Sequence, residues 1–307
     1  MQPTIEILDR IRKNSRDNKE EIFTRLYRYL LRPDLYYLAY KNLYANKGAG
    51  TKGVNDDTAD GFSKEKVDLD DGTYAPNPVR REYIQKKQNS TKKRPLGIPT
   101  FTDKLVQEVL RMILESVYEP IFSNNSHGFR PNRSCHTALK SLKREFSGVS
   151  WFIEGDIKGC FDNIDHQVLA NVINAKIKDA RLIQLIWKFL KAGYMEDWQY
   201  HATYSGCPQG GIVSPLLANI YLNELDKFVE KTAKEFYKSR DRHHTPEYDK
   251  VTWQIKKAQK QLKTATGQEK TALLQKIAQL KAVMHKTPCM SKTDKVIKYI
   301  RYADDFI

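Results

Sequence analysis

Two apolar segments that lie far apart in the chain both end in acidic side chains. The alternating run at 296–301 leads into Tyr302-Ala303-Asp304-Asp305, and Trp151-Phe152-Ile153 precedes Asp156. Neighbouring carboxylates repel each other, and a bound divalent cation removes that repulsion. If both segments are strands of one sheet, the three carboxylates converge, so the fold must pair the middle of the chain with its end. A solvated turn for the Asp pair and a helix-capping role for Asp156 are the alternatives.

The charge of the chain limits the kinds of partner that it can have. Its 307 residues include 52 Lys and Arg against 37 Asp and Glu, a formal net charge of +15. That excess favours a polyanion, although a solvated basic surface is an equal alternative. The first fifteen residues lack the apolar core of a signal peptide, and no run of about 18 apolar residues occurs. The four cysteines are scattered. We therefore expect no membrane partner and a cytoplasmic location.

Apolar residues at helical spacing predict helices over much of the chain. Thr102 is expected to cap a long helix that ends at Pro120, and Asp165 is expected to cap a later one. Further helices are expected within 18–46, near 134–148, within 179–191 and from Ser214-Pro215 onward, and strands are expected at 79–84 and 198–204. This mixture predicts an α+β fold.

The composition changes between Lys227 and Lys295, where Lys, Gln, Glu and Ala dominate. Two apolar repeats at helical spacing, near 251–262 and 273–284, are separated by Gly267. The pattern indicates two antiparallel helices that form a hairpin. A coiled-coil dimer is less favoured, because neither arm reaches four heptads.

Four separated blocks of sequence resemble the reverse transcriptases of group II introns, and the resemblance covers nearly the whole chain. The N-terminal segment NKGAGTKGVN (46–55) is also similar to that family's first block. The four blocks are RPLGIPT (94–100) with Asp103, Leu105 and Gln107; HGFRPNRSCHTAL (127–139); GDIKGCFDNIDH (155–166); and GCPQGGIVSPLLANIYLNELD (206–226) followed by RYADDFI (301–307).

The resemblance implies the fingers and palm of a right-hand polymerase. Residues 1–148 would form mainly the fingers with an N-terminal extension, and 149–307 mainly the palm, an antiparallel sheet packed on helices. The segment 227–295 would be a helical insertion within the palm. Because the chain stops two residues after Asp305, we expect the thumb to be absent and polymerisation to be impaired, with RNA binding retained. An exposed sheet edge would favour a homodimer.

The resemblance also implies a metal and nucleotide site. Asp156, Asp304 and Asp305 would be catalytic and, with the Ile157 carbonyl, would hold two Mg²⁺. Phe161 would lie beneath the sugar and exclude a 2′-hydroxyl, which favours deoxynucleoside triphosphates; an ordinary core phenylalanine is the alternative.

The triphosphate would be held by basic side chains of the fingers block. Arg94 would pair with phosphate oxygens, because a guanidinium fork suits phosphate. Lys86 would be a second phosphate contact, with Lys92 or Lys93 as alternatives, because the sequence departs here from the family pattern.

Other residues are candidates for contacts with bases and nucleic-acid backbone. Gln209, in the turn Pro208-Gln209-Gly210-Gly211, would contact the incoming nucleotide or its templating partner. Arg130 and Arg133 would grip the template backbone, and Lys256 and Lys260 of the helical hairpin would contact structured RNA. Solvated side chains are the alternative for the two arginines. A solvated helical arm, or a surface that meets another subunit, is the alternative for the two lysines.

Together these features imply an RNA-directed DNA polymerase of a group II intron that also acts as a maturase on its intron RNA. An RNA template and a DNA primer would be its other partners. A domesticated or CRISPR-associated relative is the nearest alternative within the enzymes. A non-catalytic RNA-binding module, with the palm as a scaffold, is the alternative from another class, and the intact Asp156, Asp304 and Asp305 weigh against it.

Overall fold

The computed structural model describes residues 4–46, 48–60, 69, 72–85, 91, 93–237, 244–290 and 296–307. The chain forms two compact units, which are described separately: residues 1–228 with 299–307, and residues 229–298. Helix α8 (Ser214–Phe236) begins in the first unit and ends in the second. Helices and short sheets are both present, so the expected α+β class is confirmed.

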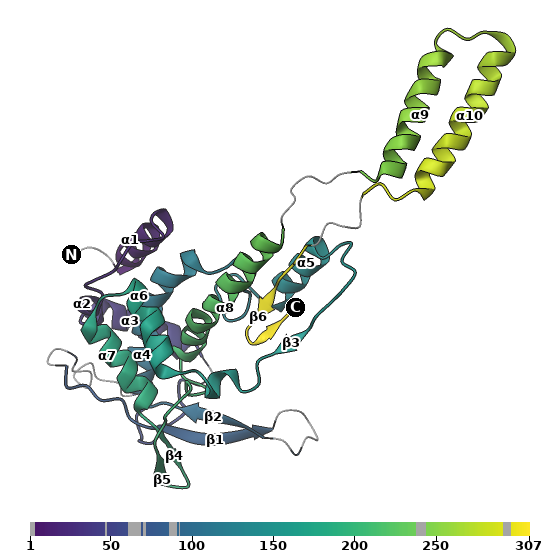
Figure 1. Cartoon of the computed structure of the whole chain (residues 1–307). Helices are drawn as coiled ribbons and strands as arrows, with labels where there is room; N and C mark the ends of the chain where they lie inside the picture. Colours follow the sequence, from purple (N-terminus) through teal and green to yellow (C-terminus); the bar gives the residue numbers. More distant parts are fainter. Residues whose placement is uncertain are drawn as a thin grey trace. The chain divides into compact units, whose positions relative to one another are not determined.

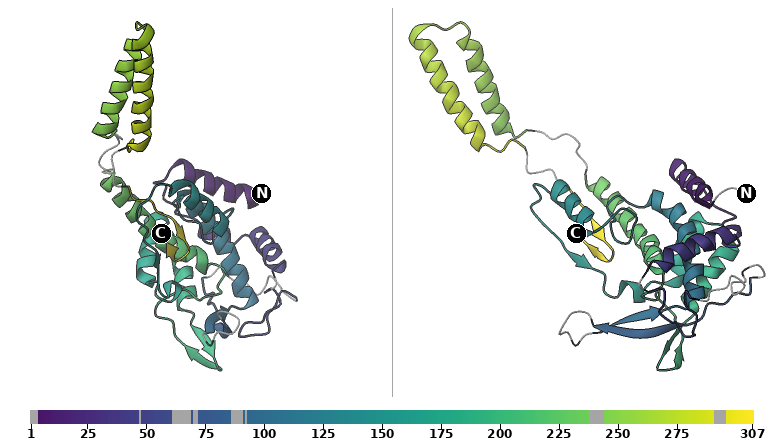
Figure 2. Two further views of the ribbon diagram at one scale, coloured as in Figure 1. Left: turned by 90° about the vertical axis from the view of Figure 1, so that its right-hand side faces the viewer. Right: turned by 180° about the vertical axis from the view of Figure 1, so that it is seen from behind.

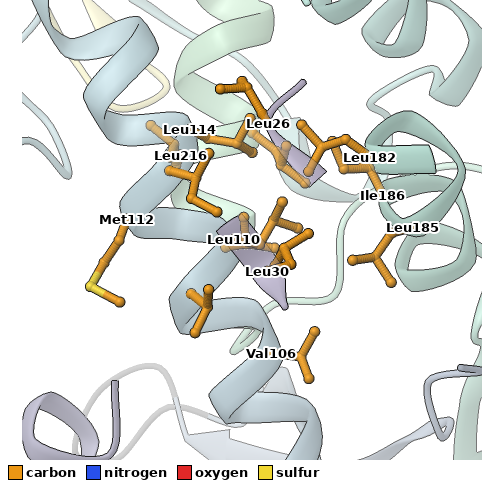
Figure 3. Packing of buried hydrophobic residues seen from close by; sticks show 14 of the residues in the cluster. Leu26, Leu30, Val106, Leu110, Met112, Leu114, Leu182, Leu185, Ile186 and Leu216 are labelled. Carbon is orange, nitrogen blue, oxygen red and sulfur yellow. The ribbon is translucent and has the colours of Figure 1, made fainter. Parts of the chain in front are cut away.

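The first unit is built around α4 (Phe101–Tyr118), which is buried along most of its length. Helices α1 (Thr4–Asp17), α2 (Tyr27–Leu30) and α3 (Pro33–Tyr44) pack against it. Figure 3 shows Leu110 and Leu114 of α4 in the same cluster as Leu26, Leu30 and Leu182. This core fixes the position of the strand that leads into α4.

The cap of α4 differs from the sequence expectation. Thr100 is the N-cap, and its side chain accepts a hydrogen bond from the Asp103 backbone N–H at 3.2 Å. Thr102 lies inside the first turn and donates its hydroxyl to Asp57 instead. Two threonines two residues apart satisfy the same capping pattern, so local sequence did not separate them.

Four further helices complete the first unit and the start of the second. They are α5 (Cys135–Glu145), α6 (His166–Lys176), α7 (Ala180–Lys191) and α8, with short 3-10 turns at Glu119–Ile121 and Cys160–Asp162. The Asp165 side chain caps α6 by accepting from the Val168 N–H at 2.8 Å, as expected. Among the described residues, no helix has both the length and the apolar character needed to cross a membrane.

A four-stranded sheet has the order β2-β1-β4-β5. Strand β1 (Val79–Gln85) pairs antiparallel with β2 (Lys93–Ile98) and parallel with β4 (Tyr194–Glu196). In Figures 1 and 2 the blue arrows of β1 and β2 lie beside the teal hairpin of β4 and β5. The strand expected at 79–84 is thus confirmed, whereas only Gln199–His201 of the one expected at 198–204 forms a strand, β5.

A second, three-stranded sheet has the order β3-β7-β6. It consists of β3 (Gly155–Asp156), β6 (Arg301–Tyr302) and β7 (Asp305–Phe306). The expected apolar strand before Asp156 is shorter than the sequence suggests: Trp151 and Ile153 lie outside it and are 89% and 77% exposed. The yellow hairpin of β6 and β7 lies beside α5 in Figure 1, consistent with the contacts between β6 and α5.

The second unit contains α9 (Pro246–Leu262) and α10 (Gly267–Lys286), which pack against each other. Ile255 and Ala258 of α9 and Ile277 of α10 are buried at this contact. The Thr245 side chain caps α9 by accepting from the Tyr248 N–H at 3.2 Å.

Candidate active site

The three acidic residues singled out in the sequence lie together on the β3-β7-β6 sheet. Asp156 on β3 is directly opposite Asp305 on β7, and Asp305 is also opposite Tyr302 across the hairpin. Ala303 and Asp304 form the two-residue turn, and the Asp304 carbonyl accepts from the Ile157 N–H at 3.2 Å. Segments from the middle and the end of the chain therefore bring Asp156, Asp304 and Asp305 to one place.

The pKa of Asp305 is raised above its ordinary value. Removal from water contributes most, followed by repulsion from the carboxylates of Asp304, Asp156 and Glu154. A cation placed among these groups would offset the repulsion.

The donor set fits Mg²⁺. In the described part of the chain, no three His, Cys, Asp or Glu side chains already converge as ligands of one metal ion. Mg²⁺ commonly takes one or two carboxylates and completes its shell with water and substrate phosphates. The exposed Asp156 and Asp305, with the half-buried Asp304, offer hard oxygen ligands of this kind. The Ile157 carbonyl already accepts from the Cys160 N–H at 3.2 Å, and its second lone pair stays available.

A buried ion pair holds the hairpin that carries two of these acids. Arg301 on β6 and Asp226 on α8 both have fully buried side chains, and their guanidinium and carboxylate meet at 2.7 and 2.8 Å. The same guanidinium donates to the Ala303 carbonyl at 2.7 Å, and the Tyr299 hydroxyl donates to Asp226 at 2.8 Å. These contacts fix the turn before Asp304 to α8. Arg301 and Asp226 were not singled out from the sequence as anchors, although both lie in the blocks 206–226 and 301–307.

Gly128 allows the second sequence block to approach the hairpin closely. A Cβ atom at this position would lie 2.3 Å from the Ala303 backbone nitrogen. The Gly128 carbonyl also accepts from the Asn219 side chain at 2.8 Å. Ala303 itself has a φ of 57°, in the left-handed region. A side chain at position 128 would therefore displace the turn that carries Asp304.

The candidate nucleotide residues Arg94 and Gln209 contact each other. The Arg94 Nε donates to the Gln209 Oε1 at 3.0 Å, and the Gln209 Nε2 donates to both Asp162 carboxylate oxygens at 3.1 and 3.2 Å. Asp162 thus orients the Gln209 amide so that its oxygen faces Arg94. Asp162 was not singled out from the sequence, although it lies in the block GDIKGCFDNIDH.

Asp162 and Gln209 also line a cavity of about 320 Å³. Lys86 and Lys92 lie outside the described residues, and Lys93 is the exposed first residue of β2. The choice among these lysines stays a prediction.

Phe161 is half-buried and meets a second aromatic ring. The ring of Phe129 lies edge-on at 6.1 Å between centroids, with an interplanar angle of 82°. The Phe161 carbonyl accepts from the Cys207 N–H at 2.7 Å, which ties the Gln209 turn to the segment that carries Phe161. A Cβ atom at Gly206 would meet the Phe161 carbonyl oxygen at 2.7 Å. Phe129, in the block 127–139, was not singled out from the sequence.

Arg130, a candidate template contact, is engaged within the protein, and its contact with a template stays a prediction. Its side chain is buried, its Nε and Nη2 donate to Glu119, and its Nη1 donates to the backbone carbonyls of Ser123 and Ser126. Arg133 is half-buried and donates to the Asn124 carbonyl at 2.6 Å. We therefore attribute to Arg130 a role in holding its own loop.

The acid-bearing hairpin with the opposed Asp156, together with the Arg94–Gln209 pair, fits the α+β fold of a polymerase. The chain belongs to the reverse transcriptase (RNA-dependent DNA polymerase) family, whose model matches residues 84–264. It is 63% identical over 312 residues to the group II intron-encoded protein LtrA of Lactococcus lactis subsp. cremoris, a match that covers 100% of this chain and 52% of that protein. The resemblance to group II intron reverse transcriptases seen in the motifs is thereby confirmed.

Two more distant relatives carry the same association with introns. One is an uncharacterized 91 kDa protein in the cob intron of Schizosaccharomyces pombe, 43% identical over 310 residues, with 98% of this chain and 37% of that protein covered. Another is nuclear intron maturase 1, mitochondrial, of Arabidopsis thaliana, 27% identical over 226 residues, with 57% of this chain and 30% of that protein covered. The chain spans about half the length of LtrA and less of the other two.

Proposed function

We propose that this chain supplies the fingers and palm of an RNA-directed DNA polymerase of a group II intron. Residues 1–148 would be mainly fingers and 149–307 mainly palm, with 227–295 as a helical hairpin inserted in the palm. The observation that carries the proposal is the register that sets Asp156 opposite Asp305, next to the turn residue Asp304. The reverse transcriptase match and the identity to LtrA support the same activity.

The residues of the site have distinct roles in this proposal. Asp156, Asp304 and Asp305 would hold two Mg²⁺, which supply activation of the primer 3′-hydroxyl and stabilisation of the leaving pyrophosphate. The Arg94 guanidinium binds triphosphate oxygens, and the Gln209 amide, oriented by Asp162, lies beside the nascent base pair. The Phe161 ring excludes a ribose 2′-hydroxyl from the sugar position.

The experiment is addition of a single deoxynucleotide to a DNA primer annealed to an RNA template. At saturating protein we expect addition with Mg²⁺ and none with a chelator, because the carboxylates need the cation to bind the triphosphate. A chain that binds the primer–template tightly but adds no nucleotide at any Mg²⁺ concentration would support the non-catalytic scaffold instead.

We also propose that the second unit contacts intron RNA, as a maturase would. Residues 244–290 contain nine lysines against three acidic residues, and Lys256 and Lys260 are exposed on α9. One relative is a group II intron-encoded protein and another is an intron maturase, and both support intron RNA as the partner. The homodimer expected from the sequence stays a prediction.

Replacing Lys256 and Lys260 together with alanine is expected to weaken binding to structured RNA. The affinity falls as salt rises, and each lost phosphate contact should make the slope of log affinity against log salt shallower by roughly one. Fluorescence anisotropy over a salt series measures that slope, and the double variant Lys140→Ala with Lys143→Ala, two exposed lysines on α5, serves as the control for loss of charge alone. An unchanged slope in the double variant would exclude the α9 lysines from the interface.

A further inference from the structure

The turn between β4 and β5 carries a tryptophan in an unfavourable position. Glu196 pairs with Gln199, so Asp197 and Trp198 form a two-residue hairpin turn, and both have positive φ values of 48° and 63°. Turns of this kind favour Asn-Gly or Asp-Gly, because glycine adopts the left-handed conformation without steric cost. Here Trp198 occupies the glycine position.

Trp198 is 88% exposed, so burial of its side chain does not offset the cost of that backbone conformation. A bulky residue with positive φ is an outlier that suggests a functional constraint. The ring gains little from burial and the backbone is strained. A tryptophan is therefore expected in this turn only if its ring binds a ligand.

A cavity of about 400 Å³ lies beside this ring. Tyr83 of β1 also lines it and is 47% exposed, and its hydroxyl donates to the Glu196 Oε1 at 2.6 Å, which holds the second ring in place. Two exposed aromatic rings thus border one open cavity. Unstacked bases of single-stranded RNA stack on surfaces of this kind.

The charges of the cavity favour a base over a phosphate as occupant. Glu82, Glu196 and Asp197 line it together with Arg80 and Arg81. Both arginines are already engaged, Arg80 with Glu82 and Arg81 over the Tyr194 ring at 3.3 Å and beside Glu196 at 3.9 Å. Of the three acids, Asp197 has no ion pair within the described part of the chain. Carboxylates accept hydrogen bonds from the exocyclic amino groups of bases, whereas they repel phosphate. A base with an amino group fits this lining better than uracil.

We propose that Trp198 and Tyr83 form a binding site for one unstacked, amino-bearing base of a single-stranded RNA segment. The Asp197 carboxylate reads the base edge, and the phosphates stay outside the cavity. This site rests on the proposed RNA-binding function and lies outside the residues assigned to metal and nucleotide.

The test is anisotropy of a labelled single-stranded oligocytidylate RNA with the full chain, compared with oligouridylate and a blunt RNA duplex. Trp198→Ala and Trp198→Gly should each weaken oligocytidylate binding roughly ten-fold and leave duplex binding unchanged, because base–aromatic stacking is lost. Trp198→Phe should retain most of the affinity. Tyr37→Ala, which removes a 72% exposed ring on α3, should have no effect.

Trp198→Gly also separates binding from folding. Because glycine suits the left-handed turn, its midpoint of thermal unfolding should equal or exceed that of the unaltered chain. Oligocytidylate affinity that is unchanged in both Trp198→Ala and Trp198→Gly would overturn the site. Equal affinities of the unaltered chain for oligocytidylate and oligouridylate would also overturn it. Binding of the duplex without binding of single strands would overturn the site alone, and binding of neither RNA would also overturn the proposed RNA-binding function.

Discussion

Replacing Asp226 with alanine is expected to lower the free energy of unfolding by about 3–5 kcal/mol, because it leaves a buried guanidinium without its counter-ion. Arg301 and Asp226 both have fully buried side chains, so water cannot replace the lost carboxylate. The turn before Asp304 should also loosen, since the Arg301 guanidinium holds the Ala303 carbonyl at 2.7 Å. Urea unfolding followed by circular dichroism measures the change.

An exposed ion pair on the same helix provides the control. Glu224 and Lys227 meet at 2.6 Å with side chains that are 48% and 59% exposed. Glu224→Ala should cost less than about 1 kcal/mol, since solvent screens such pairs. Equal destabilisation by Asp226→Ala and Glu224→Ala would show that the buried pair does not anchor the hairpin. Partial recovery in the double variant Asp226→Leu with Arg301→Met is expected, because an apolar pair leaves no buried charge.

Local sequence patterns predicted the elements whose signals lie within a few residues. The strand expected at 79–84 is β1, and Asp165 was placed correctly as a helix cap. The sequence also suggested that Asp156 lies beside the Asp pair, provided that the two apolar segments are strands of one sheet. The register of β3 with β7, which depends on long-range pairing, supplies that condition.

Contacts between charged residues from different blocks could not be predicted in this way. Arg130 and Arg301 look alike in a sequence, as arginines beside motifs, yet both are buried against specific acids, Glu119 and Asp226. Their burial depends on how α8 and the loop after α4 pack, which no local pattern encodes. The link from Asp162 through Gln209 to Arg94 was missed for the same reason, since it joins three separated segments.

The apolar run at Trp151-Phe152-Ile153 shows the opposite error. Hydrophobicity predicted a strand there, but the structure pairs only Gly155 and Asp156 and leaves Trp151 89% exposed. Hydrophobic side chains tend to be buried, whereas a strand also requires a partner strand in register. The acid at the end of the run was therefore predicted better than the strand before it.

Asp304→Asn is expected to slow the addition of a deoxynucleotide by roughly a thousand-fold, because a metal clamp supplies several kcal/mol of transition-state stabilisation. The change is isosteric and lies at a half-buried turn, so the midpoint of thermal unfolding and the affinity for primer–template should stay close to those of the unaltered chain. Glu154→Gln is the matched control, since Glu154 also repels Asp305 but is not assigned to the metal.

The most direct test of a shared metal site is the same single-nucleotide assay with Asp156→Asn, on an RNA template and at saturating protein. Asp156 comes from a different part of the chain, and only the pairing of β3 with β7 places it opposite Asp305. A loss of addition as large as that of Asp304→Asn, with RNA affinity and thermal stability unchanged, is the predicted result. Addition by Asp156→Asn at the rate of the unaltered chain would contradict it, because the three carboxylates would then not act as one site.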